Sequence, residues 1–117
     1  MPVERVIEGN ELAFVVADAF PVSPGHTLII SRRHVADYLA LTETEMAAMN
    51  QLLRAARHRL TEDLHPDGFN VGVNVGMAAG QTIAHVHIHL IPRYVGDVAS
   101  PEGGVRNVIP GRGRYQV

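Results

Sequence analysis

The sequence predicts an α+β domain in which an antiparallel sheet of about five strands carries one long amphipathic helix on one face. Several short segments alternate apolar and polar residues, as half-buried strands do, and one stretch over residues 42–62 repeats apolar residues at helical spacing. A length of 117 residues fits one domain better than two. We therefore expect a single domain over 1–117, with its core at about 5–94 and an irregular tail at 95–117.

Three strands are expected before the helix. The apolar runs at 5–7 and 12–17 flank a turn at 8–11, whose glycine and asparagine tolerate positive φ, and this pattern predicts a β-hairpin. Residues 18–25 have the composition of a turn. The apolar run at 27–30 that follows predicts a buried strand.

The helix has the clearest signal in the chain. Thr42 and Glu45 form a capping box at its start, and the segment 65–68, which contains Pro and Gly, ends it. Between them, apolar residues spaced by three or four positions form one stripe: Met46, Met49, Leu53, Ala56 and Leu60. This stripe predicts that the helix covers one face of the sheet.

Two further strands are expected after the helix. Residues 69–76 alternate between an apolar face and a face of small or polar residues: Phe69, Val71, Val73 and Val75 against Asn70, Gly72, Asn74 and Gly76. Residues 82–93 alternate again, and a phase irregularity between Ile83 and Val86 predicts a bulge or a late start of that strand. The Gly- and Pro-rich stretch after Pro92 predicts no regular structure.

Composition excludes several kinds of covalent chemistry. The chain has no Cys, and all ten basic residues are Arg. Thiol nucleophiles, disulfides, CxxC metal sites, Schiff bases and a P-loop lysine are therefore excluded. The three Ser residues do not lie in a GxSxG motif, which argues against a serine hydrolase. Any covalent chemistry falls to the seven His residues and the carboxylates.

The charge and the hydropathy of the chain limit the kinds of partner that we expect. The formal net charge is −2, so nothing favours nucleic acid as a partner. Residues 1–92 hold six Arg and ten acidic residues, whereas 93–117 hold four Arg and two, which indicates an anion near the C-terminus. The longest apolar run, at 12–17, has six residues and predicts neither a signal peptide nor a membrane span. We expect a cytoplasmic protein.

Three histidines alternate with apolar residues in the last predicted strand. His85, His87 and His89 would place their side chains on one strand face. His85 and His89 would be about 13 Å apart along the strand, so the three cannot share one metal ion. Two could share an ion with a carboxylate, but Gln81 precedes the strand and Arg93 follows it. We therefore expect no metal here, and the remaining structural alternative is a solvated, His-rich face.

A line of imidazoles suits an elongated polyanion, because neighbouring rings can take different roles in proton transfer and nucleophilic attack. A nucleophilic His must be unprotonated at Nε2, with its Nδ1–H held by an acceptor such as a backbone carbonyl. Upstream, the loop 76–80 is built from small residues whose N–H groups can approach an anion. Asn74, Gln81 and Thr82 add neutral donors near the start of the strand.

These residues resemble the histidine triad (HIT) superfamily of nucleotide hydrolases and transferases. The family pattern, three His alternating with apolar residues, is similar to His85-Val-His-Ile-His-Leu-Ile91. Gly80-Gln-Thr82 resembles the segment that precedes the triad, and Pro24-Gly-His-Thr-Leu28 resembles an upstream motif. The single long helix between these motifs also matches, and the resemblance covers about residues 5–94.

The resemblance implies catalytic roles for four histidines. His87 would attack the α-phosphorus of a nucleotide and form a nucleotidyl-histidine intermediate, which water then hydrolyses. His89 would lie beside the bridging atom and assist the leaving group. His85 and His26 would orient the other two through hydrogen bonds.

The resemblance also implies substrate-binding residues. Asn74, Gln81 and Thr82 match positions around the α-phosphate, and Gly80 belongs to the same segment. Asp18, eight residues before His26, matches the position that binds the ribose hydroxyls. Its alternative role is in a local turn.

The resemblance implies that the protein is a hydrolase. It would act on dinucleoside polyphosphates or adenylylated compounds and release a nucleoside monophosphate. An adenosine phosphoramidase of the Hint type and a non-catalytic nucleotide- or metal-binding module are the alternatives. Family members are usually homodimers and need no metal or other cofactor for the chemistry, and a purine nucleotide is the expected partner. The absence of Cys excludes the zinc site of some members, and the tail at 103–110 resembles bacterial relatives near the Fhit-like hydrolases.

The remaining candidates are expected to be surface residues. His34, His58 and His65 have no partners in the sequence pattern and are assigned to surface or helix-end positions. The arginines near the C-terminus are individually expected to be solvated, although Arg93 or Arg106 could reach the outer phosphates.

Overall fold

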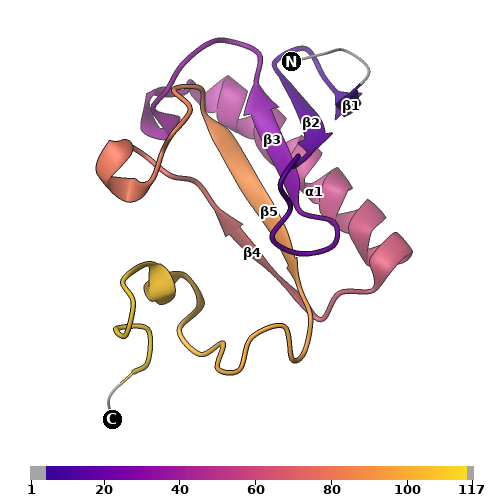
Figure 1. The fold of residues 1–117 in the computed structure, drawn as a ribbon. Coiled ribbons are helices and arrows are strands. Elements are labelled where there is room, and N and C mark those ends of the chain that lie inside the picture. Colours follow the sequence, from indigo (N-terminus) through magenta and orange to yellow (C-terminus); the bar gives the residue numbers. More distant parts are fainter. Residues whose placement is uncertain (1–4, 116–117) are drawn as a thin grey trace.

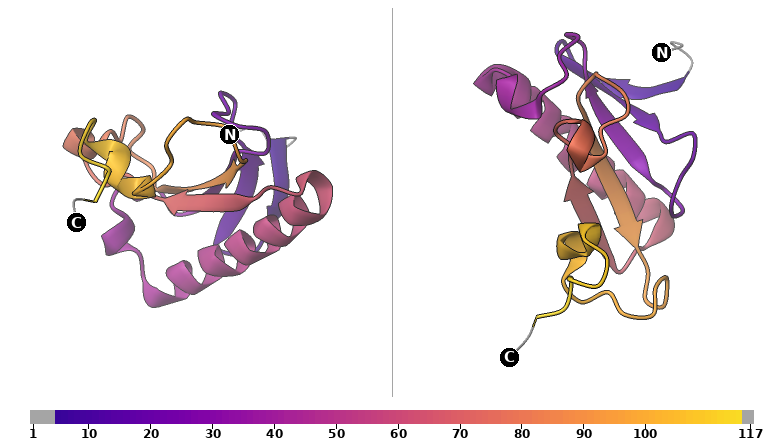
Figure 2. Two further views of the ribbon diagram at one scale, coloured as in Figure 1. Left: turned by 90° about the horizontal axis from the view of Figure 1, so that it is seen from below. Right: turned by 60° about the vertical axis from the view of Figure 1, so that its left-hand side comes forward.

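The computed structural model describes residues 5–115 and confirms the predicted α+β fold. Five strands form one sheet in the order β1-β2-β3-β5-β4, with every neighbouring pair antiparallel, and the helix α1 lies across one face (Figures 1 and 2). The elements are β1 (Val6–Gly9), β2 (Ala13–Ala17), β3 (Thr27–Ser31), α1 (Glu43–Leu64), β4 (Gly68–Gly72) and β5 (His87–Arg93). The expected domain limits at 1 and 117 lie outside the described residues.

The β1–β2 hairpin closes through a side chain. Asn10 Oδ1 accepts hydrogen bonds from the backbone N–H groups of Leu12 (3.0 Å) and Ala13 (2.9 Å), and its Nδ2 donates to the carbonyl oxygen of Ala48 on α1 (3.0 Å). The predicted hairpin is confirmed, although neither Gly9 nor Asn10 has the positive φ that these residue types tolerate. The hydrogen bonds from the N–H groups of Leu12 and Ala13 to the Asn10 side chain hold the turn without a residue in the left-handed conformation.

The helix begins with the predicted capping box. Thr42 Oγ1 accepts from Glu45 N–H (3.1 Å), and Glu45 Oε1 accepts from Thr42 N–H (2.9 Å). The guanidinium of Arg33 also binds both carboxylate oxygens of Glu45, at 2.9 and 2.8 Å, and holds the pKa of that carboxyl down at about 2. His65 ends α1 in the left-handed conformation, with φ of 50°.

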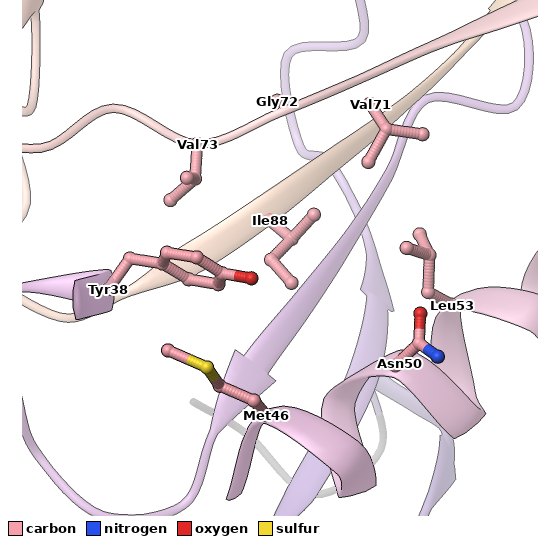
Figure 3. Close-up of a pocket in the computed structure, with 8 residues that line it drawn as sticks. All are labelled: Tyr38, Met46, Asn50, Leu53, Val71, Gly72, Val73 and Ile88. Carbon is pink, nitrogen blue, oxygen red and sulfur yellow. The ribbon is translucent and has the colours of Figure 1, made fainter. Parts of the chain in front are cut away.

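The buried stripe of α1 differs slightly from the predicted one. Its apolar members that are buried against the sheet are Met49, Leu52, Ala56 and Leu60. Met46 and Leu53, which the spacing assigned to the core, are only partly buried. Both side chains line a cavity between α1, β4 and β5, together with Val71 and Ile88, and therefore stay partly accessible (Figure 3).

Both late strands are shorter than the alternation predicts. β4 ends at Gly72 instead of 76, with Val71 and Val75 exposed, and β5 starts at His87 instead of 82. The late start is thus confirmed, whereas the inclusion of His85 in the strand is wrong. The chain between the strands leaves the sheet through a 3-10 turn at Met77–Ala79, flanked by Gly76 and Gly80, whose φ angles are 89° and 94°.

The tail after β5 folds back beside β4 (Figure 1). It contains one short 3-10 helix, Gly104–Val108, which we call the tail helix and which the sequence did not predict. Across residues 5–115, no helix has the length and apolar character needed to cross a lipid bilayer.

Candidate active site

β5 carries two of the three predicted histidines onto the face of the sheet opposite α1. Its residues alternate regularly, with Ile88 and Leu90 buried toward the helix and His87 and His89 half-buried on the other face. Gly72 of β4 lies opposite His89 and has nothing within 4 Å of the position a Cβ would take, so the sheet leaves open space there.

The imidazole of His87 is held in one tautomer. Its Nδ1 lies 2.9 Å from the carbonyl oxygen of His85. A carbonyl oxygen only accepts, so Nδ1 carries the proton and Nε2 carries a lone pair. This is the protonation pattern that a nucleophilic imidazole requires.

His85 supports this arrangement from outside the strand. Its Nε2 donates to the carbonyl oxygen of Ser31 at the end of β3 (2.6 Å), while its own carbonyl binds His87. The ring of His34 lies edge-on against His85, with the ring centroids 4.9 Å apart. His34 is exposed, as predicted, but it is not isolated, because the chain segment after β3 brings its ring against His85.

His26 and His89 form a hydrogen-bonded pair, although 63 residues separate them. His26 Nε2 and His89 Nδ1 are 2.9 Å apart, and the backbone N–H of Val22 donates to His26 Nδ1 (3.1 Å). Because His26 Nδ1 accepts, its proton lies on Nε2 and is donated to His89 Nδ1. His89 is thereby left with its proton on Nε2.

Burial favours the neutral form of both imidazoles. His26 is 4% exposed, and desolvation lowers its pKa, while Asp18 acts weakly in the opposite direction. Desolvation also lowers the pKa of His89, and the neighbouring rings of His87 and His26 add to that effect. Both imidazoles are therefore neutral at neutral pH.

Asp18 lies beside this pair at the end of β2. Its Oδ1 accepts from the N–H of Phe20 (2.8 Å), which forms a local turn, and its Oδ2 lies 3.4 Å from His26 Nε2. The turn role weighed for Asp18 is thus present, and its second oxygen still faces the histidine pair.

Asp18, His26 and His89 place one ligand-type atom each within 4.8 Å of one another. This cluster contains only one of the three strand histidines: the β2–β3 turn brings Asp18 to a different pair, His26 and His89, which the expectation about the strand did not include. The hydrogen bonds nevertheless disfavour a metal ion. His26 Nε2 carries a proton while Val22 occupies Nδ1, and a metal ligand needs a free lone pair.

The other predicted binding residues occupy the loop before β5. Gln81 Oε1 accepts from Gly76 N–H (2.9 Å), and its Nε2 donates to the carbonyl oxygen of Ala36 (2.8 Å), so this amide holds the loop to the segment before α1. Gly80 and Thr82 are exposed, and within 5–115 no hydrogen bond joins them to a histidine. Their role toward a substrate stays a prediction.

Two cavities adjoin the histidines. One, of about 240 Å³, is apolar apart from its histidines and is lined by Phe14, Leu28, Ile30, Ile83, His85 and His87. The other, of about 410 Å³, includes His26, His89 and Asn74, together with Val105, Asn107 and Val108 of the tail helix. The rings of His87 and His89 are 5.1 Å apart, so the two cavities meet at this pair.

Sequence reasoning missed the tail helix and the backbone groups that hold the histidines. The N–H of Val22 and the carbonyl of Ser31 fix two imidazoles, yet every residue type except proline could supply both groups. The tail helix carries no periodic signal because it has only five residues.

The fold and the site define a class of small α+β proteins. In this class one helix covers an open antiparallel sheet, and interacting histidines lie on the free face of that sheet. The chain belongs to the HIT family, because the HIT domain model matches residues 3–96.

Among curated relatives, AP-4-A phosphorylase of Mycobacterium tuberculosis is 34% identical over 93 residues, which cover 79% of this chain and 48% of the relative. The asymmetrical bis(5'-nucleosyl)-tetraphosphatase of Schizosaccharomyces pombe is 31% identical, covering 80% and 51%. The chain thus spans about half the length of these relatives. A HIT family protein from Bacillus anthracis has a similar structure, with a TM-score of 0.75 and 29% identity over 96% of this chain and 70% of that one.

Proposed function

We propose that the protein cleaves dinucleoside polyphosphates or related adenylylated nucleotides at the α-phosphate through a covalent intermediate on His87. The observation that carries this proposal is the hydrogen bond from His87 Nδ1–H to the carbonyl oxygen of His85, which leaves Nε2 free to attack. The names of the relatives support the substrate class.

In the first step, the lone pair of His87 Nε2 forms a bond to the α-phosphorus, and the bond from that phosphorus to the bridging oxygen breaks. The electron pair leaves with the bridging oxygen. The Nε2–H of His89 donates a hydrogen bond to this oxygen and stabilises its charge. The carbonyl of His85 stabilises the positive charge that His87 acquires.

In the second step, water attacks the same phosphorus, and the N–P bond breaks with its electron pair returning to His87. The water gives its oxygen to the nucleoside monophosphate and one proton to solvent. Inorganic phosphate as acceptor would instead yield a nucleoside diphosphate, as the name of the mycobacterial relative indicates for that protein.

The neutral state of His89 favours this substrate class over the phosphoramidate alternative. A polyphosphate leaves as a stable anion and needs only a hydrogen bond, whereas an amine leaving group needs a proton. Because burial lowers the pKa of His89, little of it is protonated at neutral pH. A polyphosphate ester therefore fits the pair better.

The apolar cavity beside His87 is the proposed site for the substrate's purine base, since its walls are aliphatic and aromatic side chains. By the family resemblance, Asp18 would bind the ribose, while Asn74, Gly80, Gln81 and Thr82 would surround the α-phosphate. His26 acts as a positioning residue for His89.

The products of diadenosine tetraphosphate test this proposal. We expect AMP and ATP in phosphate-free buffer, measured by ion-exchange chromatography, with the same rate after EDTA treatment. ADP in place of AMP, released together with ATP in the presence of phosphate, would identify a phosphorylase. Binding without turnover would support the non-catalytic module instead, and activity that EDTA removes and zinc restores would overturn the metal-free mechanism.

We also propose a homodimer formed through β4. This strand ends the sheet, so one of its edges lacks a partner within the described residues. Beside it, a cavity of about 230 Å³ opens between α1 and β4 (Figure 3). Its apolar walls include Met46, Leu53, Val71 and Val73. A second copy could pair its own β4 here and cover these side chains.

Light scattering coupled to size-exclusion chromatography tests the dimer. We expect twice the chain mass of 12.7 kDa for the wild type. Val71→Arg, which places a charge on this half-exposed margin, should give the single-chain mass and keep the circular dichroism spectrum. A wild-type protein that keeps the single-chain mass over a 100-fold range of protein concentration would contradict the dimer.

A further inference from the structure

The tail helix forms one wall of the cavity that contains His89. Val105, Asn107 and Val108 line it from the tail side, while His26 and His89 line it from the sheet. The cavity adjoins a second one of about 440 Å³, with which it shares Asn107 and other residues. A groove therefore leads away from the proposed leaving-group histidine along the tail.

The tail is held in place by contacts of its own. Arg106 Nε donates to the carbonyl oxygen of Gly113 (3.1 Å), and its guanidinium lies over the ring of Tyr115, 4.6 Å from the centroid. Gly103 has a φ of 91°, and a Cβ there would come within 2.0 Å of the Gly113 carbonyl oxygen. Arg106 thus has a structural role in folding the tail, which makes it a poor phosphate ligand.

The groove has the chemistry of a nucleoside site more than of a phosphate site. Val105 and Val108 remain 64% and 78% exposed on its rim. Arg93, the cation at its far end, is already bound by both carboxylate oxygens of Asp97. Neutral polar groups, side-chain amides and the hydroxyls of Ser23 and Ser100, line the rest of the groove and suit a heterocycle and a ribose; the amides are Asn70, Asn74 and Asn107.

We propose that this groove is a subsite for the leaving nucleoside, with the tail helix determining specificity for substrates that carry a second nucleoside. The proposal rests on the proposed function and adds the orientation in which the substrate lies across the site. The base of the attacked nucleotide occupies the apolar cavity beside His87, and the second nucleoside occupies the groove beyond His89. The adjoining pair of histidines would then lie at the bond that breaks.

Two substrates with the same adenylyl half separate this role from a purely structural one. Diadenosine triphosphate carries a second nucleoside, and adenosine 5'-fluorophosphate carries only fluoride. We expect the double variant Val105→Asp/Val108→Asp to lower kcat/KM for diadenosine triphosphate roughly 10- to 100-fold. Turnover of the fluorophosphate should stay within about twofold of the wild type. Val95→Asp is the matched control, because Val95 is an exposed valine outside the groove.

An equal loss on both substrates would overturn the subsite, because the tail would then act only on the fold or on the α-phosphate. No loss on either substrate would also overturn it. Failure of the proposed function gives a different result, namely turnover of both substrates by His87→Asn.

Discussion

His87→Asn is expected to abolish turnover and leave the fold unchanged. The asparagine amide can still donate to the carbonyl oxygen of His85, so the local structure keeps its hydrogen bond. It has no atom at the position of Nε2, and the covalent route is lost. Loss of a covalent nucleophile typically lowers kcat by about 10⁴-fold or more, which steady-state kinetics on diadenosine tetraphosphate would measure.

His58→Asn is the matched control, because His58 is an exposed histidine on α1 and should keep full activity. A second measurement follows the intermediate itself. Wild-type protein quenched without acid should retain a labelled nucleotide, whereas His87→Asn should retain none. Turnover by the variant within about tenfold of the wild type would rule out His87 as the nucleophile.

The sequence could predict what depends on local periodicity. The capping box at Thr42 and the alternation through His87 and His89 are signals that neighbouring residues define, and α1 and β5 confirm them. The extent of β4 and the start of β5 depend instead on where a distant strand stops pairing. The alternation of apolar and polar residues continues past Gly72 and before His87. The pairing of β4 with β5, however, ends where Gly72 lies opposite His89.

The interactions within the site depend even more on the tertiary fold. His26 lies 63 residues from His89, and no spacing rule relates them, so only a resemblance could associate the two. The approach of His34 to His85 and of Asp18 to His26 had no signal at all in the sequence pattern. Backbone groups that fix a tautomer leave no trace in residue identity.

His26→Phe is expected to release His89 from its fixed tautomer. Phenylalanine keeps the ring but neither accepts from Val22 N–H nor donates to His89. A mobile His89 should lower kcat roughly 10- to 100-fold, since small misplacements of reacting groups have effects of that size. His26→Gln, whose amide can both accept and donate, should recover part of the loss.

The pH dependence distinguishes this role from simple packing. In the wild type, protonating His89 Nδ1 brings it against the Nε2–H of His26, so this pair and burial both keep the pKa of His89 low. His26→Phe should move that pKa up toward its ordinary value, as measured by ¹H–¹⁵N NMR titration of the imidazole. An unchanged pKa would show that His26 only fills space.

The same pair links stability to pH. The pKa values of His26 and His89 are below 6.5 in the folded protein, and they return to about 6.5 on unfolding. Below pH 6.5 the unfolded chain therefore binds more protons, and the free energy of unfolding falls as the pH decreases. Removing His26 removes its share of this effect. Urea denaturation of His26→Phe should accordingly show a shallower loss of stability between pH 6.5 and 5 than the wild type, and an equal slope would mean that His26 titrates normally in the folded state.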